Sequence, residues 1–191
     1  MQASLLVLAG GESRRMGRPK AWLEVGDTYL VRYVAGRLAA EFTDVMVSFA
    51  EPEQLEQPVP YRIVFDRKSS AGPLAGMEAG LAAAREEVMF VLACDMPYVS
   101  LELAQAAVAA ARSCDAAIPR IGGRPEPVCG AYRRTALPAI AAALDAHLLK
   151  AADLVERLDV TWLEDVDPRQ LESLNTPEDL ERFNAAQPSQ R

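Results

Sequence analysis

The stretch from Gly10 to Lys20 contains the residue types that bind a polyphosphate. Gly10 and Gly11 directly follow an apolar run, and a backbone without a Cβ lets main-chain amides approach an anion closely. Ser13 adds a hydroxyl donor. Arg15 and Lys20 add positive charge that can stabilise a triphosphate and the charge that develops on it during a reaction. The stretch is therefore predicted to be a phosphate-binding loop.

The spacing in this loop differs from two better-known phosphate-binding patterns. It lacks the Gly-Lys-Ser/Thr ending of a Walker A loop and the GxGxxG order of a dinucleotide-binding loop. Gly17 permits a turn that would bring Lys20 back over the phosphates. The structural alternative is a glycine-rich turn with a solvated basic flank.

A second candidate site residue, Asp95, also follows an apolar run. A carboxylate at the end of a buried strand is well placed to hold Mg²⁺, which prefers one or two carboxylates together with phosphate oxygens. Pro97 keeps Met96 extended and so sets the direction of this corner. The alternative is an aspartate that caps a helix after a strand.

The charge distribution favours a small anionic ligand over a nucleic acid. The net charge is −7, whereas proteins that bind nucleic acid along their surface are usually basic. Against that background, a cluster of four cations lies within seven residues: Arg14, Arg15, Arg18 and Lys20. Such a local cluster suggests one anion held at one place, although a solvated basic loop would have the same composition.

The three cysteines are far apart in the sequence and form no CxxC pair, so neither a zinc site nor a disulfide framework is expected. No apolar run approaches the roughly 18 residues that span a bilayer. The amino-terminal segment enters a strand-like run without a basic region and cleavage site. We therefore expect a soluble, cytoplasmic protein.

Buried strands and helices that alternate along the chain must position these residues. Continuous apolar runs at 4–9 and 88–93 are typical of strands covered on both faces, and further strands are predicted at 45–49 and 61–65. Helices are predicted at 29–38 and 74–85. This order predicts an α/β fold, a three-layer α/β/α sandwich with a mainly parallel, Rossmann-like sheet. Because ligands bind beyond the carboxyl ends of such strands, Gly10–Lys20 and Asp95 are expected to share one crevice.

The second half of the chain follows a less regular pattern. Helices are predicted at 101–112, 135–145 and 150–158, and strands at 116–119, 128–132 and 160–163. The glycines and prolines of 122–127 predict a turn or loop. Thr176 followed by Pro177 predicts a helix start. We expect a single domain over residues 1–185 and a frayed tail at 186–191.

The string from Leu8 to Lys20, LAGGESRRMGRPK, resembles the nucleotide-binding signature of the molybdenum cofactor guanylyltransferases, the molybdopterin-guanine dinucleotide biosynthesis protein A family. That family belongs to a nucleotidyltransferase superfamily with a glycosyltransferase-A-like fold. The resemblance extends through most of the chain. It includes Asp66, the segment Gly72–Met77, the corner Cys94–Pro97 and the carboxyl-terminal Asn175–Leu180.

The resemblance implies transfer of GMP from GTP to molybdopterin or its molybdenum-loaded form, with Mg²⁺ as cofactor. It implies catalytic roles for Lys20, Arg15 and Asp95, with Asp95 as metal ligand and Asn175 on the acceptor side. The nucleotide-binding residues that it implies are Leu8, Ala9, Gly10, Gly11, Ser13, Lys20, Asp66, Gly76 and Asp95. Other cofactor-biosynthesis proteins and recipient molybdoenzymes are further expected partners.

The residues themselves leave several of these roles open. Asp66 with Arg67 and Lys68 can equally form a surface ion-pair turn, and Asn175 can simply shape the turn before the Thr176 cap. Residues in and after the 122–127 loop are candidates for an acceptor pocket, although many loops have this composition: Arg124, Glu126 and Tyr132.

Three positions depart from the family pattern. Ser48 stands where an asparagine is common, Ser173 replaces the first residue of an Asn-x-Asn pair, and 147–150 lacks the family's glycine and arginine. These departures affect the acceptor side more than the nucleotide side. One alternative is therefore transfer from CTP or to a sugar phosphate, although CTP-using relatives typically have Ala-Gly in place of Gly10-Gly11. A second alternative is a non-catalytic nucleotide-binding protein.

Overall fold

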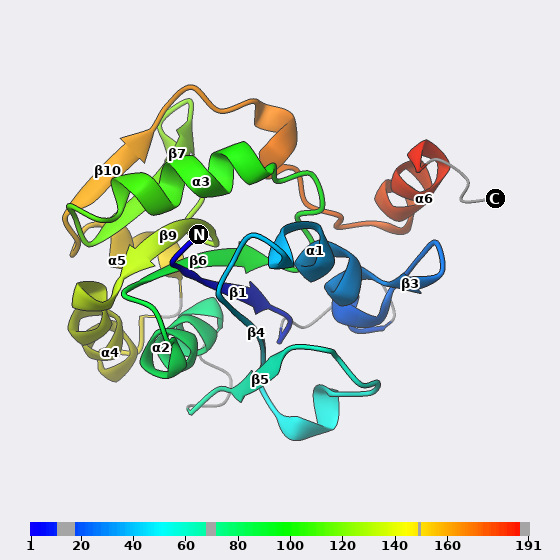
Figure 1. Ribbon diagram of the computed structural model, residues 1–191, viewed down its shortest axis with the longest axis horizontal. Helices are drawn as coiled ribbons and strands as arrows, with labels where there is room; N and C mark the ends of the chain where they lie inside the picture. Colours follow the sequence, from blue (N-terminus) through cyan, green and yellow to red (C-terminus); the bar gives the residue numbers. More distant parts are fainter. Residues whose placement is uncertain (11–17, 68–71, 149, 188–191) are drawn as a thin grey trace.

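The computed structural model describes residues 1–10, 18–67, 72–148 and 150–187, and shows a central sheet with helices on both faces (Figure 1). The strands are β1 (Ser4–Leu8), β2 (Glu24–Val25), β3 (Thr28–Tyr29), β4 (Asp44–Phe49), β5 (Arg62–Phe65), β6 (Val88–Ala93), β7 (Ala116–Ile121), β8 (Arg124–Pro125), β9 (Cys129–Arg133) and β10 (Val160–Leu163). The α-helices are α1 (Leu30–Ala39), α2 (Pro73–Ala83), α3 (Leu101–Ala110), α4 (Leu137–Asp145), α5 (Ala151–Val155) and α6 (Pro177–Ala186). In the described residues, four 3-10 helices complete the order: η1 (Lys20–Trp22), η2 (Pro52–Gln54), η3 (Arg134–Ala136) and η4 (Pro168–Leu171).

The main sheet has the strand order β10-β7-β9-β6-β1-β4-β5, with β8 paired to β7. Strand β1 runs parallel to both of its neighbours, so that Leu8 lies opposite Ser48 of β4 and Ala93 of β6. Strand β9 runs antiparallel to β6 and β7. The expected mainly parallel sheet is therefore confirmed. The carboxyl ends of β1, β4 and β6 meet at one edge, where ligands bind in such sheets.

Side chains from alternating positions of the strands feed two separate cores. Leu5 and Val7 of β1 pack with α1 and α3, whereas Leu6 packs with α2, α4 and α5. Figure 1 shows α3 above the sheet and α2 and α4 below it. The expected three-layer architecture is confirmed, and burial on both faces explains why β1 and β6 are continuously apolar.

Helix α2 lies very close to the strand ends because it carries glycines where it meets β1. A Cβ at Gly80 would overlap the Leu6 side chain, and a Cβ at Gly76 would come within 2.7 Å of Ser48 Oγ. Side chains at these two positions would push the helix outward. The two glycines therefore set the depth of the crevice above β1 and β4.

Three local features differ from the prediction. A hairpin of β2 and β3, turning at Gly26 with φ of 54°, follows η1 where no strand is expected. Part of the predicted 122–127 loop is regular, because Gly122 and Gly123 turn the chain with φ of 56° and 79° and β8 then pairs with β7. Helix α6 extends through Ala186, past the domain boundary expected at residue 185. Its predicted start at Thr176 and Pro177 is confirmed.

Candidate active site

The loops after β1 and β6 are joined at their origin by backbone hydrogen bonds. The Ala9 N–H donates to Ser48 O at 2.8 Å, and the Cys94 N–H donates to Leu8 O at 3.0 Å. These bonds continue the parallel ladder one step beyond the strands, so the two loops leave the sheet side by side. The segments after β1 and β6 therefore begin next to each other, as the sequence predicts, and this edge beyond β1, β4 and β6 is called the crevice below.

Lys20 is the centre of the polar groups in this crevice. Its Nζ donates to Asp95 Oδ2 at 2.6 Å and to Asn175 Oδ1 at 2.7 Å. The Lys20 and Asp95 side chains are each 18% exposed, so the ion pair is shielded yet open on one side. Three segments far apart in sequence therefore meet at one ammonium group. Asn175, expected on the acceptor side, is hydrogen-bonded to Lys20.

The position of Lys20 follows from its neighbour Trp22 in η1. Trp22 is fully buried, stacks on Phe49 at 5.8 Å between ring centroids, and meets Tyr29 edge-on at 5.6 Å. Its Nε1 donates to Gln54 O at 2.7 Å. A large aromatic ring with a satisfied N–H anchors a short helix firmly. The returning loop is therefore fastened to the core two residues after its lysine.

Asp95 lies at a corner that is braced from both sides. The Leu174 N–H donates to Asp95 O at 2.8 Å, which brings the carboxyl-terminal segment against the end of β6. On the other side, the Arg37 guanidinium donates to Pro97 O and, at 2.9 Å, to Val99 O. The carboxylate thus projects from a backbone that is tied to α1 and to the segment before α6.

Asp66, Gly76 and Leu8 meet at the base of the crevice. A Cβ at Gly76 would lie 2.9 Å from Leu8 Cδ2 and 3.4 Å from Asp66 Oδ1. Asp66 Oδ1 is buried and has no hydrogen-bond partner among the described residues. Burial raises the pKa of Asp66 to about 6. A buried carboxylate oxygen without a donor is rare in folded proteins, and a ligand N–H or O–H would satisfy it.

The alternative role for Asp66 in an ion-pair turn receives no support from Arg67. The Arg67 guanidinium pairs with Glu78 of α2 at 3.5 Å. Lys68 lies outside the described residues.

Glu126 lies between β8 and β9, close enough to Asp95 to be affected by its charge, and is one of several acceptor-side candidates from the sequence. Burial raises its pKa, the negative charge of Asp95 raises it further, and the Val128 N–H opposes the shift. Tyr132 is fully buried, and its hydroxyl donates to Pro127 O at 2.6 Å. Tyr132 thus braces the loop beside Glu126 from within the core, so the suggestion that it lines an acceptor pocket is wrong.

The oxygen atoms around Lys20 suit a hard divalent cation. Asp95 offers a carboxylate and Asn175 an amide oxygen, both within hydrogen-bond reach of the same ammonium group. Among the residues that the structure describes, no three His, Cys, Asp or Glu side chains form a ready metal cage. This donor set fits Mg²⁺, which is commonly held by one or two carboxylates and completed by substrate phosphates and water.

Gly10 packs against protein atoms. A Cβ at this position would lie 2.6 Å from the Ala50 backbone nitrogen, so the space beside its Cα is taken by the end of β4. Three further expected site residues, Gly11, Ser13 and Arg15, lie outside the described residues.

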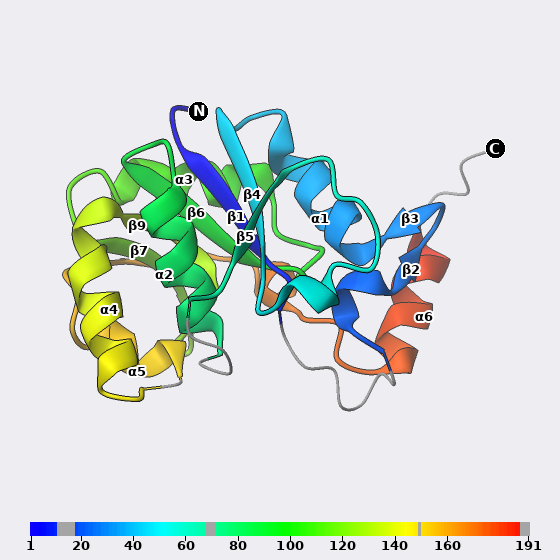
Figure 2. The same cartoon turned by 90° about the horizontal axis from the view of Figure 1, so that it is seen from below.

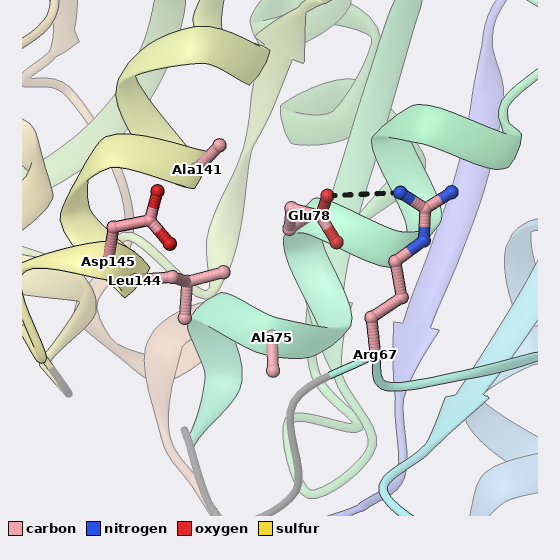
Figure 3. A pocket seen from close by; sticks show the side chains of 6 residues that line it. All are labelled: Arg67, Ala75, Glu78, Ala141, Leu144 and Asp145. Atoms are coloured by element: carbon pink, nitrogen blue, oxygen red, sulfur yellow. Dashed lines mark hydrogen bonds and ion pairs between the residues drawn. The ribbon is translucent and has the colours of Figure 1, made fainter.

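A cavity of about 280 Å³ lies between α2 and α4 (Figure 3). It is lined by Arg67, Ala75, Glu78, Ala141, Leu144 and Asp145. Gly76 and Gly80 face β1, whereas Ala75 and Glu78 lie on another face of α2 and meet α4. None of the cavity residues belongs to the Lys20 cluster, so the cavity is separate from the polar centre of the crevice.

Comparison with known proteins points to one family. Residues 5–170 match the model of a family described as MobA-like NTP transferase domain. A probable molybdenum cofactor guanylyltransferase of Pelotomaculum thermopropionicum is 36% identical over 187 residues, covering 94% of this chain and 91% of that protein. No helix in the described ranges has the length and apolar character needed to cross a membrane.

Solved structures show the same architecture. The molybdopterin-guanine dinucleotide biosynthesis protein A from Archaeoglobus fulgidus superposes with a TM-score of 0.83 at 25% identity, covering 95% of this chain and 97% of that one. The 2-C-methyl-D-erythritol 4-phosphate cytidylyltransferase from Thermus thermophilus has a TM-score of 0.74 at 24% identity, covering 97% and 98%. The second likeness concerns the fold alone.

Proposed function

Since the chain belongs to the MobA-like NTP transferase family and is a nucleotidyltransferase, we propose that it transfers GMP from GTP to the terminal phosphate of molybdopterin or Mo-molybdopterin. The observation that carries this proposal is the meeting of Lys20, Asp95 and Asn175 at the open edge of the sheet. Transfer between a triphosphate and a second phosphate needs positive charge at the phosphates and oxygen ligands for the metal. The Lys20 ammonium and the two side-chain oxygens beside it can supply both.

The reaction needs no covalent enzyme intermediate. An oxygen of the acceptor phosphate forms a bond to the α-phosphorus of GTP, and the bond from that phosphorus to the oxygen bridging the β-phosphate breaks. Pyrophosphate leaves with the electron pair, and the product is a guanine dinucleotide. Lys20 stabilises the charge on the phosphate oxygens, and the crevice holds the two substrates in line.

Mg²⁺ would be held by Asp95 and phosphate oxygens, and when bound it neutralises charge on the triphosphate. Asp66, Gly76 and Leu8 line the nucleoside end, where the unsatisfied Asp66 oxygen can accept a donor of the base or ribose. Gly11, Ser13 and Arg15 complete the phosphate contacts in this proposal. Asn175 contributes on the acceptor side, beside Lys20.

The proposed preference for GTP rests on the relatives. Gly10 gives no separate reason for it, because the missing side chain at this position makes room for protein atoms. An alanine methyl at position 10 would collide with Ala50 before it could reach a base.

The buried free thiols of Cys94, Cys114 and Cys129 suit a reducing compartment such as the cytoplasm. Delivery of the product to molybdoenzymes, with help from other biosynthesis proteins, belongs to the same proposal.

The direct test is to incubate the pure protein with Mg²⁺, molybdopterin and each of GTP, CTP and ATP, and to identify the product by mass. Formation of molybdopterin guanine dinucleotide with release of pyrophosphate is the expected result. A cytosine dinucleotide would assign the protein to cytidylyl transfer. Nucleotide binding without any pyrophosphate release under these conditions would contradict the enzymatic proposal.

A further inference from the structure

The ammonium group of Lys20 is oriented by protein atoms. It has three N–H donors, of which one goes to Asp95 Oδ2 and one to Asn175 Oδ1. In the described part of the chain, no other acceptor takes the third. Because the three N–H bonds are tetrahedrally arranged, two bound partners determine the direction of the third. A lysine held in this way loses less conformational freedom when it binds a phosphate.

Asn175 is in turn held by the segment that starts α6. Its backbone N–H donates to Asp179 Oδ2 at 3.0 Å, and its Nδ2 donates to Ser173 O at 3.4 Å. Asp179 also accepts from the Thr176 N–H at 2.9 Å, within the capping box of α6. The amide oxygen of Asn175 is therefore oriented by the first turn of α6, together with Leu174 beside it, whose N–H donates to Asp95 O.

Helix α6 is docked mainly through one side chain. Phe183 is its one buried residue, only 1% exposed. The Phe183 ring meets Tyr33 of α1 and Tyr98 edge-on, each at 5.4 Å between centroids. Tyr98 belongs to the braced corner that follows Asp95. Phe183 therefore links α6 both to α1 and to the corner that carries the catalytic carboxylate.

Polar contacts at the edge of α6 support this docking. Asn184 Nδ2 donates to Glu24 O at 3.2 Å, and the Tyr33 hydroxyl donates to Gln187 Oε1 at 3.2 Å. Figures 1 and 2 both show α6 beside α1 and the β2–β3 hairpin, outside the main sheet and its helical layers. The helix also lies beyond residues 5–170, which match the family model.

We propose that Phe183 is a positioning residue for nucleotidyl transfer, which holds Asn175 against Lys20 and so aims the remaining N–H of Lys20 at a nucleotide phosphate. The inference rests on the proposed function for the identity of that nucleotide. Phe183 contacts neither substrate and acts through Asn175. Loss of its ring is expected to release the first turn of α6 from the crevice while the sheet stays folded.

A double-mutant cycle tests this coupling. Phe183→Ala, Asn175→Ala and the double variant are prepared in the full chain, and their affinities for Mg·GTP and for guanosine are measured by calorimetry. Each single variant is expected to lose about 3–10-fold in Mg·GTP affinity, the size of one hydrogen bond, with guanosine affinity unchanged. Because Phe183 acts through Asn175, the double variant should bind Mg·GTP about as tightly as Asn175→Ala alone. Turnover with molybdopterin should follow the same non-additive pattern.

Phe42→Ala is the matched control. Phe42 is also buried, 8% exposed, and stacks on Phe90 at 6.3 Å, but it precedes β4 at the opposite end of that strand from the crevice. Its truncation should lower the melting temperature and leave the ratio of Mg·GTP to guanosine affinity unchanged. Phe183→Leu, which keeps an apolar side chain in the same place, should restore most of that ratio.

Losses that add in the double variant, or an unchanged affinity ratio in folded Phe183→Ala, would overturn the proposal. Should Phe183→Ala not fold, Phe183→Val replaces it in the cycle, because it also removes the ring contacts with Tyr33 and Tyr98 but leaves a smaller void. Additive or absent losses in that cycle count against Phe183 in the same way. Failure of the wild-type protein to make any dinucleotide would contradict the proposed function instead, and the affinity cycle would still decide the role of Phe183.

Discussion

Lys20 Nζ lies 2.6 Å from Asp95 Oδ2, although 75 residues of chain separate the two. Both side chains are largely covered, so their attraction is stronger than that of an exposed surface pair. The contact neutralises Asp95 in the absence of ligand. A cation bound by Asp95 must therefore share the carboxylate with Lys20, and the binding of metal and of nucleotide phosphates should depend on each other.

Lys20→Ala should weaken Mg·GTP binding by about 10–100-fold, since a charged hydrogen-bond donor to the phosphates is lost. Guanosine affinity should stay the same, because guanosine has no phosphate. Lys150→Ala, at an exposed lysine away from the cluster, is the control and should change neither affinity. Equal losses for GTP and guanosine would show that Lys20 only supports the fold.

Asp95→Asn should keep the fold and lower turnover on the order of 10²–10³-fold, because an amide cannot supply the negative charge that holds Mg²⁺. Turnover is measured across a Mg²⁺ titration, and the variant should need more metal as well as turn over more slowly. Near-native turnover at limiting Mg²⁺ would remove Asp95 from the mechanism.

Asp66 should make GTP binding depend on pH. Burial raises its pKa to about 6, so below that pH the carboxyl is protonated in the free protein and cannot accept a ligand donor with both oxygens. GTP affinity should therefore fall as the pH drops through 6 and level off above about pH 7. Calorimetric titrations from pH 5 to 8 measure this, and Asp66→Asn should remove the dependence. An unchanged profile in Asp66→Asn would assign the titration to another group.

The same carboxylate should lower the stability of the ligand-free protein at neutral pH. A raised aspartate pKa means that the folded state binds a proton more tightly than the unfolded state, so this contribution to stability is lost as the pH rises from about 4 through 6. Asp66→Asn removes the cost of burying this charge. It should thus raise the melting temperature at pH 8 by about 2–4 °C for each 1 kcal/mol gained in the free energy of unfolding, and should change it little at pH 4. Exposed Asp165→Asn is the control and should shift neither value.

GTP should compete better than CTP and ATP for the crevice. This expectation rests on the guanylyltransferase relatives, and a site that hydrogen-bonds one base edge rejects analogues that leave its buried polar atoms unpaired. Competition against a fluorescent GTP analogue measures the three affinities side by side. Tighter binding of CTP would contradict guanylyl transfer while leaving nucleotidyl transfer intact.

The chemical centre could be located from the sequence because local pattern and chain topology both determine it. Strands β1 and β6 are continuously apolar, and parallel strands bring the segments that follow them to one edge of a sheet. Lys20 and Asp95, which follow β1 and β6, were therefore expected at that edge, and they are in contact there. The start of α6 was predictable for the same reason, since a capping box depends only on neighbouring residues.

The contacts that tune the site were decided by tertiary structure. Asn175 reaches Lys20 across 155 residues of chain because Leu174 is bonded to Asp95 O and α6 is docked through Phe183 between Tyr33 and Tyr98, and no local pattern specifies these contacts. The unpaired oxygen of Asp66 and the burial of Tyr132 likewise depend on how closely helices and loops pack on the sheet. Sequence periodicity determines which face of an element is buried, whereas the partner on that face is selected by packing over the whole chain.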